Sequence, residues 1–214
     1  RNGTLSAPAA MKRARLSGRV GAGVDPAGVM QVTVELADGQ EHDVAFLVGC
    51  GADGNEAQDL LQRYDGTGPA QEELGRVHEY WNRTLGAVYV DSPDPAVNVL
   101  ANGWLLYQVL ACRVWARSGF YQSGGAYGFR DQLQDVMALI HAEPGVVREH
   151  LLRAAAHQFR DGDVQHWWHP PADRGVRTHF SDDFLWLPLA TARYVLCTGD
   201  VGVLDEEIPF LEGR

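Results

Sequence analysis

The sequence predicts a mixed fold in which the end of a β-sheet domain is followed by a mostly helical region. Residues 28–50 alternate apolar and polar side chains, which is the pattern of a half-buried strand. From Asp94 onward, apolar residues recur at helical spacing in one segment after another, and this is typical of amphipathic helices. Helices joined by loops of unequal length indicate a helical bundle or an α/α toroid.

The β region is predicted to contain a hairpin. Val32, Val34 and Leu36 share one face of a first strand, and a second strand, DVAFLVG, follows the turn-forming Ala37-Asp38-Gly39. We expect this hairpin to belong to a sheet that begins before residue 1. The elements predicted after it are helices over 53–66 and 70–84, an extended piece over 87–90, helices over 94–117, 129–141, 144–159 and 184–197, and a short helix over 201–211.

Two prolines mark the expected starts of helices. Asp94 suits an N-cap, and Pro95 suits the first helical position. Pro144 opens a later helix in the same way. A long polar and aromatic loop is predicted over residues 160–183, between the last two long helices.

Composition excludes several classes of partner. The formal net charge is -10, from 18 basic and 28 acidic residues, and such a surface repels the phosphates of nucleic acid. No apolar run reaches the roughly 18 residues that a membrane helix needs. The three cysteines are far apart and form no CxxC pair, so free thiols in a reducing compartment are expected. We therefore expect a cytoplasmic protein.

The stretch GAYGFRDQLQD, residues 125–135, is the first candidate site. Arg130 and Asp131 present a planar fork beside a carboxylate, and this pair suits vicinal hydroxyls because each hydroxyl both donates and accepts hydrogen bonds. Tyr121, Gln134 and Asp135 flank the pair and are further candidates. The alternative is that these polar residues form an ordinary solvated helix face.

The second candidate stretch is GDVQHWWHPPADRGVRTHFSDDFLWLP, residues 162–188. Its consecutive His166, Trp167 and Trp168 combine aromatic faces with hydrogen-bonding groups, as a carbohydrate ring requires. The alternative is that one or both tryptophans are core anchors. His166 and His169 could also bind metal, although their spacing is not that of a zinc motif.

Ser181, Asp182 and Asp183 precede the predicted helix that begins with FLWL. A helix cap accounts for part of this cluster, because Ser and Asp satisfy free N–H groups at a helix start. Capping does not require two aspartates, so we expect one of them to face a ligand. No GxSxG elbow, P-loop or dinucleotide fingerprint is present.

Several long stretches resemble the inverting glycoside phosphorylases of glycoside hydrolase family 94. GAYGFRDQLQDVMAL, GDVQHWWHPPADRGVRTHFSDDFLWLP and VLDEEIPFLEG carry the resemblance. RNGTLSAPAAM, LSGRVGAGVDP and NGWLLYQVLACRVWARSGFYQSGGAYGFRD are similar to one subfamily. That subfamily contains the phosphorylase-like domains of cyclic β-1,2-glucan synthases and the 1,2-β-oligoglucan phosphorylases. The resemblance covers essentially the whole chain.

The resemblance implies a three-part layout. Residues 1–50 would be the end of an N-terminal β-sandwich domain, and residues 51–92 a helical linker region. Residues 93–214 would be the first helices of an (α/α)6 catalytic barrel. Phosphorylases of this kind are often dimers, so a homodimer of the full protein is a further expectation.

The resemblance also implies roles for the candidate residues. Arg130 and Asp131 match the family's Arg-Asp motif, which holds the nonreducing-end glucosyl unit beside the bond that is cut. The loop positions that line the sugar cleft match His166, Trp168, Asp182 and Asp183. Tyr121, Gln134 and Asp135 flank the motif as weaker candidates.

The implied reaction is reversible and converts a β-glucoside and phosphate into α-glucose 1-phosphate and a shortened sugar. One carboxylic acid must protonate the leaving oxygen. Phosphate is already an anionic nucleophile, so the carboxylate that activates water in inverting hydrolases is dispensable, and hydrogen-bond donors near the phosphate are needed instead. Inorganic phosphate is then a co-substrate, and no cofactor is implied.

The family's general acid lies in a Trp-x-Asp segment downstream of the Arg-Asp motif, and its phosphate-binding His and Thr-Gly loop lie further on. These 214 residues contain no Trp-x-Asp segment, and therefore no His and Thr-Gly loop downstream of one. We therefore expect a fragment of a larger enzyme that supplies sugar-binding residues and is inactive and poorly stable by itself. One alternative is a glucan-binding or chain-length-controlling module of a cyclic β-1,2-glucan synthase without its own catalysis. Another is a helical interaction domain without affinity for glucooligosaccharides.

Overall fold

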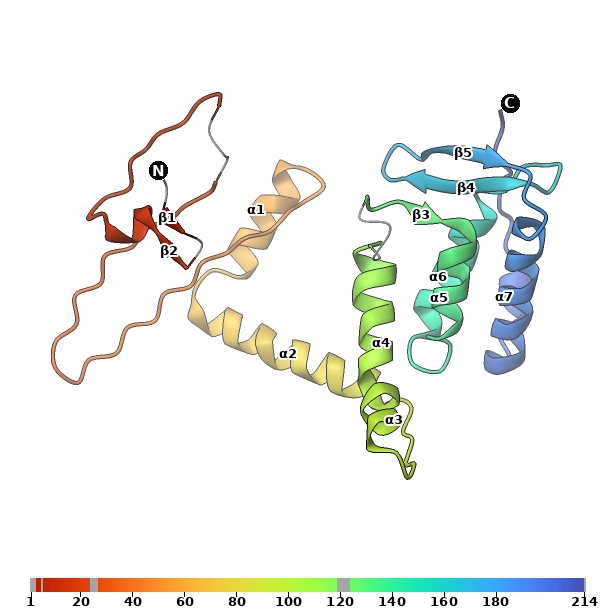
Figure 1. The fold of residues 1–214 in the computed structure, drawn as a ribbon, viewed down its shortest axis with the longest axis horizontal. Helices are drawn as coiled ribbons and strands as arrows, with labels where there is room; N and C mark the ends of the chain where they lie inside the picture. The colour runs from red at the N-terminus through yellow and green to blue at the C-terminus, as the bar shows by residue number, and fades with distance from the viewer. Residues whose placement is uncertain (1–2, 5, 24–26, 119–123, 214) are drawn as a thin grey trace. The chain divides into compact units, whose positions relative to one another are not determined.

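The computed structural model describes residues 3–4, 6–23, 27–118 and 124–213 and divides the chain into two compact units. The first unit comprises residues 1–71 and the second residues 72–214. Figure 1 shows the elements of each unit in chain order. None of the helices in the described ranges combines the length and the apolarity needed to cross a bilayer.

The first unit has little regular structure. A short antiparallel pair joins β1 (Gly3–Thr4) to β2 (Ala7–Pro8), and a 3₁₀ turn, η1 (Ala9–Lys12), follows. Helix α1 (Gly54–Arg63) confirms the first predicted helix, and the Asp53 side chain caps it by accepting from two backbone N–H groups, both at 2.9 Å. None of the described residues of this unit is buried.

The hairpin predicted for residues 28–50 is wrong as a paired structure. The turn forms, with the Gln40 N–H donating to the Ala37 carbonyl at 3.1 Å, but no strand is assigned over residues 27–53. Val32, Val34 and Leu36 are exposed. An isolated two-stranded hairpin is at best marginally stable in water, and none of the described residues of this unit is buried in a core that could cover these apolar side chains.

The second unit begins within α2 (Thr67–Leu85), which crosses the boundary between the units and confirms the second predicted helix. The extended piece after it pairs with a side chain instead of a strand. The Asn102 amide accepts from the Val90 N–H and donates to the Val90 carbonyl, both at 2.7 Å. This arrangement reproduces the two hydrogen bonds of a strand pair with one asparagine.

The long helix predicted over 94–117 is present but kinked. It consists of α3 (Pro95–Val99), a π-helical segment η2 (Leu100–Trp104), α4 (Leu105–Gln108) and a second π-helical segment η3 (Val109–Trp115). Asp94 is its N-cap and accepts from the Ala96 N–H at 2.9 Å. The kink falls at Gly103, whose φ of 134° suits glycine.

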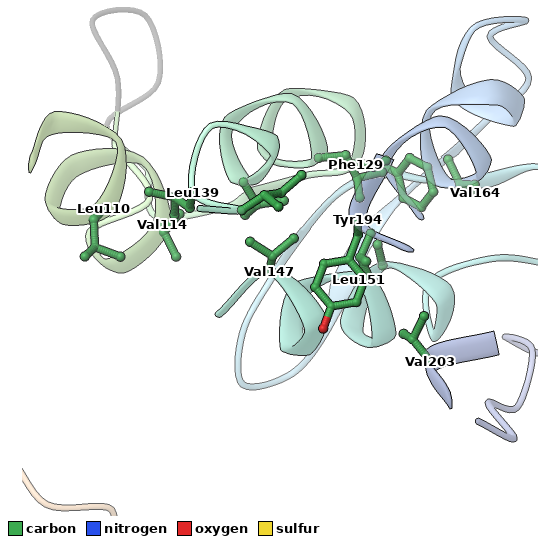
Figure 2. Packing of buried hydrophobic residues seen from close by; sticks show 14 of the residues in the cluster. Leu110, Val114, Phe129, Leu139, Val147, Leu151, Val164, Tyr194 and Val203 are labelled. Carbon is green, nitrogen blue, oxygen red and sulfur yellow. The ribbon is translucent and has the colours of Figure 1, made fainter. Parts of the chain in front are cut away.

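Three further helices build the core with this one. They are α5 (Phe129–Met137), α6 (Pro144–Ala155) and α7 (Asp183–Thr198), and a 3₁₀ turn, η4 (Val201–Asp205), follows. Their buried side chains form one apolar cluster, which reaches from Leu110 and Val114 through Leu151 and Tyr194 to Val203 (Figure 2). The predicted helices over 129–141, 144–159 and 184–197 are therefore confirmed, with somewhat earlier ends for the first two. The helix predicted over 201–211 is shorter than expected.

The loop predicted over 160–183 is wrong, because it contains two strands. Strands β4 (Val164–His169) and β5 (Arg174–Thr178) form an antiparallel hairpin, and β3 (Tyr127–Gly128) pairs with the other side of β4. The sheet lies across one end of α5, α6 and α7 (Figure 1). A register shift between Gln165 and Trp167 breaks the regular alternation of this strand, which explains why its sequence does not look like a strand.

Candidate functional site

The two candidate stretches are neighbours in the folded chain because their strands pair. Gly128 of β3 lies opposite Trp167 of β4, and Tyr127 lies opposite Trp168. Helix α5 begins directly after β3, so its first residues, Arg130 and Asp131, lie beside β4. Strand pairing thus brings together residues that are about 35 positions apart in the sequence.

Arg130 joins the first stretch to the start of α7. Its Nη1 donates to an Asp182 oxygen at 3.0 Å, and its Nε lies 3.4 Å from an Asp131 oxygen. The hydrogen bond to Asp182 is the main reason why the pKa of Arg130 is raised. Conversely, the Arg130 guanidinium, and then the Trp186 indole N–H at 3.3 Å, lower the pKa of Asp182. All three charged side chains are close to half exposed, so a ligand can reach them.

His166 and Asp183 form a second pair beside the first. The Nδ1 of His166 lies 2.9 Å from an Asp183 oxygen, and the Thr178 hydroxyl donates to the same oxygen at 3.3 Å. Asp183 is only 1% exposed, and its other oxygen is buried without a hydrogen-bond partner. Asp183 therefore lies behind the site and not on its surface.

A small hollow opens between these groups. Its lining residues are Gly128, Phe129, Arg130, Asp131, His166 and Trp167. The hollow offers a guanidinium donor, a carboxylate acceptor, an imidazole and the indole of Trp167. The hollow has a volume of about 20 Å³, which admits a single hydroxyl group and not a whole ring. Its donor and acceptors can therefore bind hydroxyl groups at one edge of a neutral polyhydroxyl ring.

The structure separates the remaining candidates from this hollow. Asp135 accepts from the Nε of Arg113 at 2.8 Å. Burial raises the pKa of Asp135, and the Arg113 charge opposes this rise. Gln134 is exposed on α5. Tyr121 lies outside the described residues.

Trp168 is a core anchor, which is the alternative that its sequence left open. It is fully buried, and its ring stacks on His157 at a centroid distance of 3.8 Å and on Tyr127 at 5.3 Å. With both neighbours in place, Trp168 has no face free for a sugar. The tryptophan that lines the hollow is Trp167, its neighbour on the same strand. Period-two alternation within β4 could have separated the two tryptophans, had the strand been recognised.

Sequence reasoning also missed the role of Gln132. This side chain is buried, accepts from the Gly128 N–H at 3.1 Å and donates to the Arg113 carbonyl at 3.0 Å. It thereby ties the junction of β3 and α5 to the preceding long helix. A polar residue between Asp131 and the apolar Leu133 was a weak signal for such a role.

Metal binding was the rival interpretation for His166 and His169. Within the described ranges, no three His, Cys, Asp or Glu side chains gather in a group that could hold a metal ion. His166 pairs with Asp183, and the His169 ring packs edge-on against Trp167 at a centroid distance of 5.5 Å. The cysteines at 50, 112 and 197 are free and exposed, as expected.

Comparison with known proteins identifies related chains. Residues 80–214 match the model of the glycosyl hydrolase 94 superfamily catalytic domain, and residues 1–67 match that of the glycosyl hydrolase 94 supersandwich domain. The cyclic beta-(1,2)-glucan synthase NdvB of Rhizobium meliloti (strain 1021) is 41% identical over 99% of this chain and 7% of its own length.

Two phosphorylases are also similar over most of this chain. The solabiose phosphorylase of Paenibacillus borealis is 30% identical over 98% of this chain and 26% of its own length. The N,N'-diacetylchitobiose phosphorylase of Vibrio proteolyticus is 26% identical over 96% of this chain and 29% of its own length. The chain thus spans less than a third of the length of each of these relatives. Because models of both a supersandwich and a catalytic domain of one family match it, this chain belongs to the glycosyl hydrolase 94 superfamily.

Proposed function

We propose that this chain holds one glucosyl unit of a β-glucan for reversible phosphorolysis to α-glucose 1-phosphate. The observation that carries this proposal is the hollow in which Arg130, Asp131 and Trp167 meet. A guanidinium beside a carboxylate offers donors and an acceptor to vicinal hydroxyls, and an indole offers an apolar face to the ring carbons. Residues 93–214 would form the first helices of an (α/α)6 barrel around this unit.

The arrangement of charges supports binding of a neutral sugar. Asp182 holds the guanidinium of Arg130 at 3.0 Å, whereas Asp131 lies further away at 3.4 Å. Asp131 therefore keeps acceptor capacity for a hydroxyl, since a carboxylate has about four lone-pair sites. The general acid and the phosphate-binding groups that the reaction needs are expected from other parts of the whole protein.

The substrate that we propose is a β-1,2-linked glucan. Its support is the 41% identity to a protein named as a cyclic beta-(1,2)-glucan synthase. The other relatives named above are phosphorylases, whose substrates are different sugars. Phosphorolysis is the reaction that their names share, and inorganic phosphate is the co-substrate that it requires.

The test uses the whole protein that carries this chain, with β-1,2-glucooligosaccharides and phosphate. We expect formation of α-glucose 1-phosphate, and we expect Asp131→Asn to lower kcat/KM by at least about tenfold, because one charge-assisted hydrogen bond contributes roughly 1.5–3 kcal/mol. Asp59→Asn is the matched control, since Asp59 is exposed on α1, and it should leave the rate unchanged. Equal rates for both variants would overturn the proposed role of the hollow.

The second candidate function is glucan binding without catalysis. The observation that favours it is the relation to the glucan synthase, which is 41% identical over 99% of this chain. The matched segment makes up only 7% of the length of that synthase. A module of this kind would bind or size the glucan while other domains synthesise it. Calorimetric binding of β-1,2-glucooligosaccharides that depends on Asp131, without any glucose 1-phosphate, would support this function over phosphorolysis.

A further inference from the structure

We infer that Asp183 is a positioning residue that holds the His166 ring so that its Nε2 accepts a hydrogen bond from one hydroxyl of the bound sugar. This inference rests on the proposed sugar-binding function and assigns a separate role to each of two residues. His166 contacts the sugar, whereas Asp183 acts only through His166. The hydroxyl that His166 recognises differs from the one that Asp131 recognises.

The contacts of Asp183 decide which nitrogen of the ring carries the proton. An ionised carboxylate can only accept hydrogen bonds. Its Oδ2 already accepts from the Thr178 hydroxyl at 3.3 Å and lies 2.9 Å from the Nδ1 of His166, so we assign Nδ1 as the donor. In the neutral ring, Nε2 is then the acceptor. Among the described residues, the only hydrogen bond of the ring is the one at Nδ1, so Nε2 stays available to a ligand.

The ring is held from several directions. Phe180 packs edge-on against it, with a centroid distance of 5.0 Å. The Thr178 hydroxyl donates to the same Asp183 oxygen at 3.3 Å and so fixes that carboxylate. His166 itself lies in β4 at the register shift between Gln165 and Trp167. Such irregularities redirect a side chain and are common beside functional sites.

The burial of Asp183 points to a ligand and not to stability alone. Its side chain is 1% exposed, and its Oδ1 is buried without a hydrogen-bond partner among the residues that the structure describes. A buried polar atom without a partner lowers the stability of the fold. Helix capping does not account for this carboxylate, because Asp183 is the first residue of α7 and no side-chain hydrogen bond caps the helix at Asp182. The carboxylate is better explained by the ring that it orients, because His166 lines the hollow with Arg130.

The charges around the hollow define the class of ligand. Asp131, Asp182 and Asp183 contribute three carboxylates, and Arg130 is the one guanidinium that pairs with any of them in the described residues. Like charges repel an anion at this range. The hollow therefore suits a neutral hydroxyl group that donates to Nε2, and it does not suit phosphate.

The experiment measures binding of a glucoside and its monodeoxy analogues to the whole protein by calorimetry. In the unmodified protein, removal of the hydroxyl that donates to Nε2 should weaken binding about tenfold, as the loss of one hydrogen bond predicts. His166→Ala should weaken binding of the parent sugar by a similar factor. This variant should then bind the parent sugar and that one analogue with equal affinity.

Asp183→Asn should reproduce this loss of discrimination. The asparagine side chain can donate to Nδ1 as well as accept from it, so the His166 ring is no longer required to carry its proton on Nδ1. Asp131→Asn is the matched comparison, and it should lose discrimination at a different hydroxyl. If Asp183→Asn does not fold, Asp183→Glu retains the charge but displaces the oxygen that holds the ring, and the same loss is expected of it.

The outcomes separate this inference from the proposed function. If the unmodified protein binds no glucoside, the proposed function fails, and this inference fails with it. If the protein binds glucosides and Asp131→Asn weakens binding, the proposed function stands. Full retention of hydroxyl discrimination in the Asp183 or His166 variants would then overturn this inference alone. A merely structural role of Asp183 would weaken binding of all analogues equally.

Discussion

At the scale of single residues, Arg130 is a charged side chain that an ion pair holds in place before a ligand binds. Its pKa is raised and that of Asp182 is lowered, mainly through their mutual hydrogen bond. The pair is close to half exposed, so solvent screens it, and its contribution to stability is small. Its more important effect is to restrict the rotamers of Arg130 before a sugar arrives.

Asp182→Asn tests this restriction. The amide oxygen can still accept from Arg130, but the charge is lost, so the guanidinium is held less firmly. We expect affinity for the glucoside to fall by less than about fivefold, because an exposed ion pair contributes little. Calorimetry of the whole protein measures this change. An effect as large as that of Asp131→Asn would indicate direct contact between Asp182 and the sugar.

The candidate residues could be predicted only in part, because the sequence does not show which way each side chain points in the folded chain. Arg130 and Asp131 stood out because the pairing of a fork with a carboxylate is visible in the sequence. The choice between Trp167 and Trp168 depends on which face of β4 each ring occupies, and that face can be assigned only once the segment is recognised as a strand. The burial of Asp183 depends on contacts with β4 and β5, which no local pattern contains.

At the scale of elements, helices were predictable and strands were not. Helix α1 begins at Asp53 and α3 begins after Asp94, because local capping determines both starts. The sheet forms because β3 meets β4, and its register depends on residues far apart in sequence. Long-range pairing of this kind has no local signature when a bulge interrupts alternation.

Gly175 provides a test of the sheet. A Cβ at this position would lie 2.2 Å from the Trp167 carbonyl oxygen and 2.8 Å from the Trp168 Cβ. Gly175→Ala should therefore push β5 away from β4 and destabilise the protein by about 1–3 kcal/mol, as overpacking does. Urea unfolding followed by tryptophan fluorescence measures the change.

Gly145→Ala is the control for this substitution. Gly145 lies in the first turn of α6, where an added Cβ would meet nothing within 4 Å. We expect unchanged or slightly higher stability, because alanine is the better helix former. Equal stability of the two variants would show that the close approach of β5 to Trp167 is absent in solution.

At the scale of the whole molecule, the two units differ in how they hold their apolar residues. The second unit contains the apolar cluster of Figure 2, whereas the described residues of the first unit include none that is buried. Apolar positions that alternate along residues 28–50 stay exposed. The sequence pattern therefore indicates a sheet face, and the described residues of this unit form no layer that covers it.

The core of the second unit also contains a titratable group. His150 is 1% exposed, and neither ring nitrogen has a hydrogen-bond partner in the described part of the chain. Burial, followed by the nearby charges of Arg153 and His157, lowers the pKa of His150 from 6.5 to about 3. The folded protein therefore keeps this ring neutral at a pH at which the unfolded chain protonates it.

This difference predicts that stability falls in mild acid. Above pH 6.5 both states hold His150 neutral, so it adds no pH dependence. Between pH 6.5 and about 3 only the unfolded state binds the proton, and stability falls by up to about 1.4 kcal/mol for each pH unit. His150→Leu removes the titrating ring and should flatten the pH dependence of the unfolding free energy between pH 7.5 and 5.

His141→Leu is the matched control. His141 is exposed, so its replacement should leave the slope unchanged. The same slope in the unmodified protein and His150→Leu would mean that His150 is solvated in solution and that this end of the core is open to water.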